Sequence, residues 1–412
     1  MSSSNDLHVM QIILTLERAG AQEVVRTLAE HLQEKGCAII VCAFQDGPMR
    51  AEIEKLGVRV EILDRPRYSV VYLPLFLAEM LRIRRELAQL VETCHIDVIQ
   101  THILQVLDFL VLTLRSDTKP RLVLWTMQNV EFFPKKQPGQ RQSLRQFKIW
   151  GYRLFYRLLT GQVDGFIAVS DEVHKAILEQ IGAIDNKVFT ICNAVNLKPF
   201  ERSGDKAALC DALDLAPDVH LVATVGRLTE QKGHRYLIDA AAPVIASLSD
   251  AHFLFIGDGE LRSELTEQAR QAGLAAHIHF LGMRKDVPDL LAAVDLFVQP
   301  SLWEGLSVAL LEAMAAAKPI VATAVSGTTQ AMIPGETGLV VPPRDSNALA
   351  EAIVQLLSHP EQAQTLGRAA RQHIIAHYSA QQQADQHMAL YHRLLKQRAA
   401  AREKKSGTYL DN

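Results

Sequence analysis

The chain has 412 residues, which is enough for two or three domains and excludes a single small binding module. Hydrophobic residues make up 48% and charged residues 22%, a balance that is typical of globular proteins and excludes a disordered or fibrous chain. The net charge of −3 excludes a general polycationic affinity for nucleic acid.

The five cysteines form no C-x-x-C pair, which fits neither a disulfide framework nor a thiolate zinc site. The N-terminus lacks the basic region of a secretory signal, and the most apolar internal stretches, 70–81 and 106–114, are shorter than the roughly 20 residues that a membrane-spanning helix needs. We therefore expect a cytoplasmic protein, with peripheral contact at the inner membrane face left open.

Short apolar runs alternate along the chain with stretches of helical spacing, which predicts two successive α/β units, each with a parallel sheet covered by helices on both faces. The predicted strands are 9–14, 38–43, 58–62, 98–100, 122–125, 166–169 and 188–191 in the first half, and 221–225, 252–256, 278–280, 296–298, 320–322 and 338–340 in the second.

The polar stretch 193–220 shows no strand pattern, so a domain boundary is predicted near residue 200. The expected domains are 1–200 and 201–379. A final helix is expected at 380–397 and a frayed polar tail at 398–412.

Ligands of open α/β sheets bind outside the carboxyl ends of the strands, so residues just after strands are the candidates. Arg227 and Lys232 follow one predicted strand and precede a helix expected from Tyr236. A guanidinium and an ammonium beside a helix start suit a diphosphate. The alternative is a solvated basic loop.

Glu304 and Glu312 stand eight residues apart, the first in a loop and the second in a helix. Helical spacing separates them by about 12 Å, too far for an acid/base pair but suited to two contacts on one extended ligand. The amides of Gly305, Leu306 and Ser307 at the helix start are then available to an anion. A helix-start carboxylate with a second, solvated Glu is the alternative.

In the first half, His102 ends a predicted strand, where its ring can bind a ligand hydroxyl or transfer a proton, although a lone histidine at such a position is more often a structural residue. Gly20 opens the turn after the first strand and lets backbone amides approach a phosphate. The sequence has no phosphate-binding P-loop, no H-E-x-x-H and no D-x-D, so we predict no metal site and no cofactor.

The segment 132–163 combines basic and aromatic side chains without any acidic residue, a pattern that anionic membrane surfaces attract. A helix that packs its aromatic face inward and solvates its basic face is the alternative, and nucleic acid has no other support in the chain. The basic residues are Lys135, Lys136, Arg141, Arg145, Lys148, Arg153 and Arg157.

Taken together, the motifs make the chain resemble the retaining glycosyltransferases of family 4. The resemblance implies the GT-B fold: two facing Rossmann-like, doubly wound parallel-sheet domains with an interdomain cleft. The matching runs are A-G-A-Q (19–22), T-H (101–102), V-S-D-x-V (169–173), I-C-N-A-V-N (191–196), V-G-R-L-x-x-Q-K-G (225–233), F-I-G-D-G (255–259), F-L-G (280–282), D-L-F-V-Q-P-S-x-x-E-G-x-S-x-x-x-L-E-A-M (295–314) and G-E-T-G-L-V-V (335–341).

The resemblance implies a role for each candidate. Arg227 and Lys232 would bind the diphosphate of a nucleotide-sugar donor, and Gly20 would bring amides to the same phosphates. Glu304 with the amides of 305–307 would hold the donor sugar, Glu312 the ribose, and His102 would lie near the transferring sugar. The base would lie near 281–284 in the second, nucleotide-sugar-binding domain, and the final helix, 380–397, would return to the first, acceptor-side domain. No protein nucleophile is implied, because the leaving phosphate would help to accept the acceptor's proton.

Several positions depart from the family pattern, which affects the expected sugar selection more than the fold. These positions are Ala19, Gln128, Ala194, Asn196, Ser326 and Gln330.

We therefore expect a metal-independent transferase that moves a sugar from a UDP-sugar, or second from GDP-mannose, to a glycan or lipid-linked acceptor in cell-surface polysaccharide or glycolipid synthesis. The alternatives are a nucleotide-sugar 2-epimerase and a non-catalytic subunit with this fold.

Overall fold

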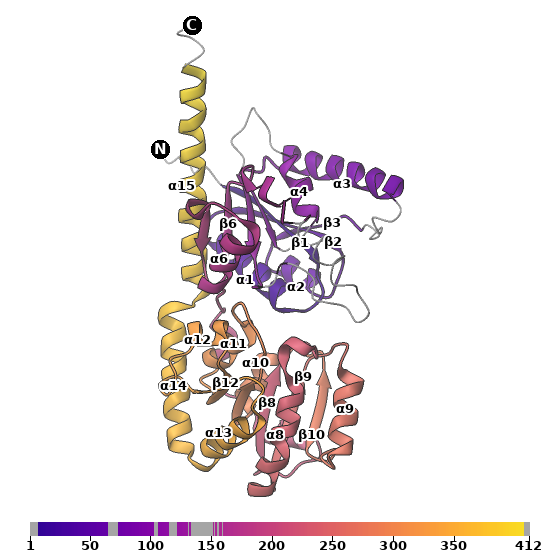
Figure 1. Cartoon of the computed structure of the whole chain (residues 1–412), viewed down its shortest axis with the longest axis vertical. Coiled ribbons are helices and arrows are strands. Elements are labelled where there is room, and N and C mark those ends of the chain that lie inside the picture. The colour runs from indigo at the N-terminus through magenta and orange to yellow at the C-terminus, as the bar shows by residue number, and fades with distance from the viewer. Residues whose placement is uncertain are drawn as a thin grey trace. The chain divides into compact units, whose positions relative to one another are not determined.

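A computed structural model shows two compact α/β units, each built around a parallel sheet (Figure 1). Unit 1 comprises Met1–Cys192 and Gln381–Asn412, and unit 2 comprises Asn193–Ala380. The structure describes residues 7–64, 73–102, 106–114, 122–130, 132, 151, 153, 154, 156–158 and 160–407.

The chain passes from unit 1 to unit 2 at residue 193, whereas the sequence placed the boundary near residue 200. Local hydrogen bonds explain the earlier position. The Asn193 side-chain amide donates to the carbonyl of Leu306, 3.1 Å away, and Val195 pairs with Ser379 in an isolated parallel bridge. Both partners belong to unit 2.

Unit 1 contains a seven-stranded parallel sheet in the order β3-β2-β1-β4-β5-β6-β7. Its predicted strands are all present, with ends shifted by two residues at most, because the apolar runs that predicted them form the strands themselves. The strands are β1 (His8–Thr15), β2 (Ala38–Gln45), β3 (Arg59–Ile62), β4 (Val98–His102), β5 (Leu122–Met127), β6 (Gly165–Ala168) and β7 (Val188–Thr190).

Helices α1 and α15 bury apolar side chains against the same side of this sheet. Leu28 of α1 and Leu394 of α15 belong to one core cluster with Val41 and Val98. The helices assigned to unit 1 are α1 (Gly20–Glu34), α2 (Arg50–Lys55), α3 (Leu73–Thr93), α4 (Val106–Leu112), α6 (Asp171–Ala176) and α15 (Ala380–Gly407).

Polar contacts also fix α15 to unit 1. Lys35 pairs with Asp385 at 2.5 Å, Arg398 pairs with Asp164 at 2.9 Å, and the guanidinium of Arg393 lies 4.8 Å from the ring centre of Phe189. Contacts are therefore spread along the helix rather than confined to one end.

The predicted end of the last helix is wrong. We expected a polar tail from residue 398, but α15 continues to Gly407. The run from Ala399 to Lys405 contains mostly Ala, Arg, Glu and Lys, which have high helix propensity and extend a helix that packing has already started.

Unit 2 contains a six-stranded parallel sheet in the order β10-β9-β8-β11-β12-β13, and here too all the predicted strands are present within two residues. The strands are β8 (His220–Val225), β9 (Ala251–Ile256), β10 (Ile278–Gly282), β11 (Leu296–Gln299), β12 (Ile320–Thr323) and β13 (Leu339–Val341).

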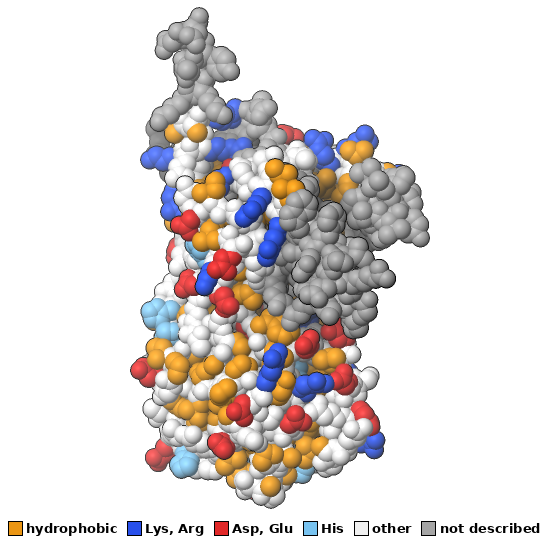
Figure 2. All heavy atoms as spheres, viewed as in Figure 1, with side chains coloured by type: hydrophobic (Ala, Val, Ile, Leu, Met, Phe, Trp, Pro, Cys, Tyr) orange, Lys and Arg blue, Asp and Glu red, His pale blue; other side chains and the backbone are white. Residues whose placement is uncertain are grey.

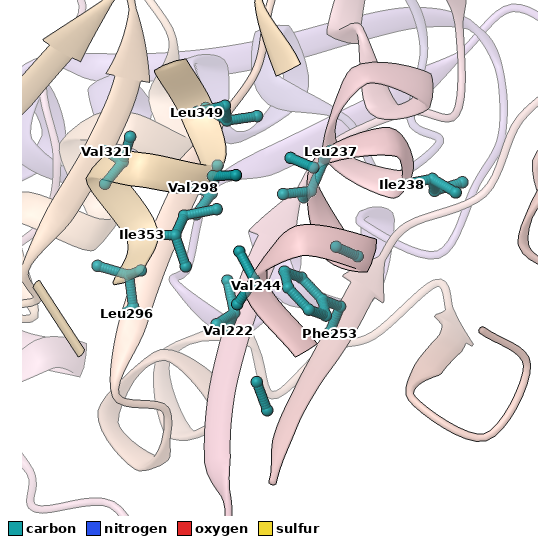
Figure 3. Packing of buried hydrophobic residues seen from close by; sticks show 14 of the residues in the cluster. Val222, Leu237, Ile238, Val244, Phe253, Leu296, Val298, Val321, Leu349 and Ile353 are labelled. Carbon is teal, nitrogen blue, oxygen red and sulfur yellow. The ribbon is translucent and has the colours of Figure 1, made fainter. Parts of the chain in front are cut away.

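The helices of unit 2 cover both sides of its sheet. They are α7 (Lys206–Asp211), α8 (His234–Ser247), α9 (Arg262–Gln271), α10 (Val287–Ala293), α11 (Val308–Ala315), α12 (Ser326–Ala331), α13 (Ser346–Ser358) and α14 (Pro360–His377). On one side, Leu237 of α8 and Ile353 of α13 pack with the strand residues Val222, Phe253 and Val298 (Figure 3). On the other side, α7 and α10 contribute Cys210 and Leu290 to a smaller cluster.

None of the described helices is both long enough and apolar enough to cross a bilayer.

Candidate functional site

Both sheets reverse their strand order next to their first strand. In a doubly wound sheet this switch point, at the carboxyl ends of the strands, is where ligands bind. The reversal lies between β8 and β11 in unit 2 and between β1 and β4 in unit 1. In unit 2, Lys232 lies in the loop after β8 and Glu304 in the loop after β11. In unit 1, Gly20 begins the helix that follows β1, and His102 is the last residue of β4.

The loop after β8 is shaped by a close backbone approach. It ends in a 3-10 turn, Glu230–Lys232, and at Gly233, whose φ of +63° favours glycine. A Cβ on Gly233 would lie 2.0 Å from the carbonyl oxygen of Pro300, so a side chain would separate this loop from the one after β11. Helix α8 starts at His234, two residues before the predicted start at Tyr236.

Hydrogen bonds join the same two loops. The Leu302 amide donates to the carbonyl of Gln231 at 2.8 Å, and the Gln231 side chain donates to the carbonyl of Trp303 at 3.0 Å. The loop after β8 therefore supports the loop that carries Glu304.

Lys232 and Glu304 meet directly. The Lys232 Nζ lies 2.5 Å from Oε1 of Glu304, and the two side chains are 17% and 6% exposed. Ser301 donates its hydroxyl to the same carboxylate oxygen at 2.7 Å, and Gln231 donates to Oε2 at 3.3 Å. A carboxylate this buried needs hydrogen-bond donors to offset the loss of water. The site therefore holds one positive and one negative group side by side.

Two of these partners, Gln231 and Ser301, were absent from the predicted site. Both lie within motifs that the sequence shows, one directly before Lys232 and one three residues before Glu304. Their positions in those motifs could therefore have identified both residues from the sequence.

Arg227 has a different setting from Lys232. It is exposed, and its guanidinium forms no ion pair with any residue that the structure describes. It follows Gly226, where the loops after β8 and β9 are in close contact: a Cβ added to Gly257 would lie 2.1 Å from the carbonyl oxygen of Gly226. The structure thus leaves this charge available to an anion.

Helix α11 begins at Val308, four residues after Glu304, because the Ser307 hydroxyl caps it by accepting from the amide of Leu310. The 12 Å spacing predicted for Glu304 and Glu312 assumed helical geometry through both residues and does not apply to this loop. Glu312 is half-buried on the second turn of α11, while 304–307 are buried.

Two positions that depart from the family pattern lie next to this site. Ser326 donates its hydroxyl to the backbone carbonyl of Glu304 at 3.1 Å, and Gln330 is half-buried, with its carbonyl accepting from the Tyr378 hydroxyl at 2.8 Å. Gly327 packs against Gly305, whose carbonyl oxygen would lie 2.6 Å from an added Cβ. Helix α12 therefore supports the loop of Glu304.

In unit 1, Gly20 is the first residue of α1 and is exposed. Ala19 precedes it in an extended conformation and offers no side chain to cap the helix. The first amides of α1 therefore have no side-chain partner at the cap, which leaves their partial positive charge at this end of the sheet.

His102 is the last residue of β4 and lies opposite Ile13 of β1. Its side chain is buried, at 2% exposed, and neither ring nitrogen has a hydrogen-bond partner among the residues described. Burial first, and then the nearby ring of His387, lower the pKa of His102 to about 3. The ring is therefore neutral at physiological pH.

Most of the segment 132–163, including Lys135, Lys136, Arg141, Arg145 and Lys148, lies outside the described residues. Within its described part, Tyr156 is buried and stacks edge-on against Trp125, with ring centres 6.1 Å apart.

The exposed side chains of this part include Arg153, Leu154, Arg157 and Leu158. Among all the residues that the structure describes, no three His, Cys, Asp or Glu side chains lie close enough together to form a metal-ligand set.

Comparisons with known proteins agree on one family. The family model for glycosyltransferase family 4 matches residues 18–198, and the model for glycosyl transferases group 1 matches residues 219–359. The lipopolysaccharide core mannosyltransferase LpsB of Rhizobium meliloti is 31% identical over 261 residues, 60% of this chain and 72% of LpsB. The chain belongs to the group 1, family 4 glycosyltransferases and is a glycosyltransferase.

Two further matches extend this result. A GDP-mannose-dependent phosphatidylinositol monomannoside mannosyltransferase of Corynebacterium glutamicum is 30% identical over 59% of this chain and 62% of its own length. The solved structure of Anabaena HepE with UDP-glucose superposes with a TM-score of 0.76 at 21% identity, covering 93% of this chain and 99% of HepE. The fold is therefore GT-B.

Proposed function

We propose that the chain is a retaining transferase that moves a sugar from a nucleotide-diphosphate sugar to a glycan or lipid-linked acceptor in cell-surface polysaccharide or glycolipid synthesis. The observation that carries this proposal is the meeting of Lys232 with Glu304 at the switch point of unit 2. A diphosphate needs the cation, and the hydroxyls of a sugar need the carboxylate and the adjoining amides.

In the proposed reaction, the bond between the anomeric carbon and the diphosphate oxygen breaks as the acceptor oxygen bonds to that carbon from the same face. The acceptor's proton passes to the leaving phosphate oxygen. Lys232 and the exposed guanidinium of Arg227 stabilise the negative charge that grows on the diphosphate, which lowers the barrier without a protein nucleophile. Gly20 adds backbone amides, Glu312 binds the ribose, and neutral His102 lies near the sugar.

The two candidates for the base of the donor are uracil and guanine. HepE was solved with UDP-glucose, whereas the Corynebacterium relative is named for GDP-mannose. The departures at Ser326 and Gln330 lie beside the loop of Glu304 and are expected to influence which sugar fits.

The first test is a thermal-shift screen with UDP, GDP, ADP and dTDP, each with and without EDTA. A cognate diphosphate at 100 times its dissociation constant adds about 2.7 kcal/mol to the free energy of unfolding. We expect a shift with one base that EDTA leaves unchanged and that Lys232→Ala and Glu312→Ala both abolish. The absence of a shift with every nucleotide contradicts the donor site.

A second test separates the alternatives. Incubation of donor with a lipid-linked acceptor, followed by NMR of the product's anomeric centre, should show transfer with retained configuration. Epimerisation of UDP-GlcNAc without acceptor would indicate the isomerase, and nucleotide binding without turnover would indicate a non-catalytic subunit.

We also propose that unit 1 contacts anionic membranes through 132–163. Two exposed arginines and two exposed leucines in 153–158, together with Ile184 at 60% exposed, combine charge and apolar surface, and Lys and Arg side chains are visible on the described face of unit 1 in Figure 2. Replacing Lys135, Lys136, Arg141 and Arg145 by Ser should weaken sedimentation with anionic liposomes. Unchanged sedimentation contradicts this contact.

A further inference from the structure

A buried set of polar side chains lies between the sheet of unit 1 and α15. It consists of Gln100 of β4, Thr126 of β5, and His387 and Tyr391 of α15, each no more than 3% exposed. We call these four residues the polar strip. Their surroundings are the apolar core that α15 shares with the sheet, where polar groups must satisfy one another.

The hydrogen bonds of the polar strip have a defined direction. Nδ1 of His387 donates to the carbonyl of Gln383 at 2.9 Å, which leaves Nε2 as the acceptor of a neutral ring. The Gln100 side-chain nitrogen donates to Oγ1 of Thr126 at 2.7 Å and faces Nε2 of His387 at 3.4 Å. The Tyr391 hydroxyl donates to Oε1 of Gln100.

This arrangement disfavours a proton on Nε2 of His387, because that nitrogen would then point a donor at the donor of Gln100. Burial also disfavours the charged ring and lowers the pKa of His387 to about 4. Tyr391 keeps its proton as well, since burial first, and then Cys37, raise the pKa of its hydroxyl.

The polar strip reaches the candidate site through β4. His102 lies two residues after Gln100, so both side chains project from the same face of the strand. Thr126 lies opposite His102 on β5, and Gln11 of β1 lies opposite Gln100. Thr101, between them on the other face, donates to the carboxylate of Asp108 at 2.6 Å.

We propose that His387 and Tyr391 are positioning residues for the transfer reaction: through Gln100 and Thr126, which share the face of the sheet that carries His102, they fix the buried polar surface beside the His102 ring and keep that surface uncharged. A neutral ring offers one donor and one acceptor to ligand hydroxyls, whereas a charged ring offers two donors. The kinetic part of this inference rests on the proposed function, whereas the protonation states of His387 and Tyr391 do not depend on it.

The first experiment reads the rings directly. In the full-length protein with 15N-labelled histidine, the signals lost in His387→Gln identify His387. We expect a protonated Nδ1, a bare Nε2 and no titration between pH 7 and pH 5. A proton on Nε2, or titration in that range, overturns the proposed arrangement whether or not the protein transfers a sugar.

The second experiment measures transfer by a matched series. His387→Leu keeps bulk but removes the acceptor, whereas His387→Gln places an amide oxygen where Nε2 was. We expect Leu to lower kcat between about tenfold and a hundredfold with KM nearly unchanged, and Gln to restore most of it. Tyr391→Phe should lower kcat and shift the acid limb of the pH–rate profile to higher pH.

The control is Thr190→Val, which removes a hydroxyl bonded to another histidine of unit 1, His174, outside the polar strip. It should leave kcat and the pH profile unchanged. Equal loss in His387→Leu and His387→Gln, or an unmoved pH profile in Tyr391→Phe, would assign these residues to packing alone. A wild-type protein without transfer refutes the proposed function but leaves the spectroscopic result intact.

Discussion

The switch points of the two units differ in how their polar groups are supported. In unit 2, Lys232 and Glu304 bind each other, and their further partners, Gln231 and Ser301, lie within three residues of them in the sequence. In unit 1, His102 has no hydrogen-bonded partner among the described residues, and its neighbours Gln100 and His387 are 287 residues apart. The site in unit 2 joins two loops whose residues are 72 to 73 positions apart in the sequence, whereas the site in unit 1 lies beside a helix 287 residues away.

The largest effect is expected at Lys232. Lys232→Ala removes a cation proposed to stabilise the leaving diphosphate and leaves the buried Glu304 carboxylate without its ion pair, so kcat should fall by about 10²–10³. The measurement is the transfer rate at saturating donor. The exposed Lys198 of the same unit provides the control, and an equal loss in Lys198→Ala would contradict the assignment.

The next effect tests the support of this loop. Gly233→Ala places a Cβ 2.0 Å from the Pro300 carbonyl, so we expect a loss of about 3 kcal/mol or more in the free energy of unfolding. Gly273 also has a positive φ, of 72°, but its Cβ would meet nothing within 4 Å. Gly273→Ala should cost only about 1 kcal/mol. Similar urea midpoints for the two variants would show that the close approach is unimportant.

Stability should also fall in acid. Burial, with a smaller effect of Lys232, lowers the pKa of His234 to about 3, while an unfolded histidine titrates near 6.5. The contribution is therefore fully present above about pH 6.5 and declines as the pH falls toward 3, at up to about 1.4 kcal/mol per unit. His234→Gln should flatten the decline between pH 6 and 5 in urea unfolding. An unchanged slope would mean that other groups dominate.

The smallest effect is expected at Ser326. Ser326→Ala removes one hydrogen bond to the Glu304 carbonyl and should cost about 1 kcal/mol, within the usual range for a single neutral bond. Differential scanning calorimetry measures the change, and Thr329→Ala on the same helix serves as the comparison. A much larger loss at Ser326 would show that α12 determines the position of the Glu304 loop.

The sequence predicted the strands of both sheets because buried parallel strands are continuous apolar runs. It predicted Lys232 and Glu304 because their motifs follow strands directly. It did not predict the spacing of Glu304 and Glu312, since the cap at Ser307 starts α11 late. It also missed the polar strip: Gln100 and His387 look like ordinary polar residues until the fold places α15 on β4.

Helix α15 also bears on how the protein is made. Unit 2 is one continuous stretch, 193–380, whereas unit 1 needs residues from both sides of it. During synthesis the ribosome must therefore produce all of unit 2 before Leu390, Tyr391 and Leu394 exist to cover the sheet of unit 1. Unit 1 is therefore translated first but completed last. Until α15 is made, the side of its sheet that α15 covers is an exposed apolar surface, which other parts of the nascent chain or chaperones must shield from aggregation.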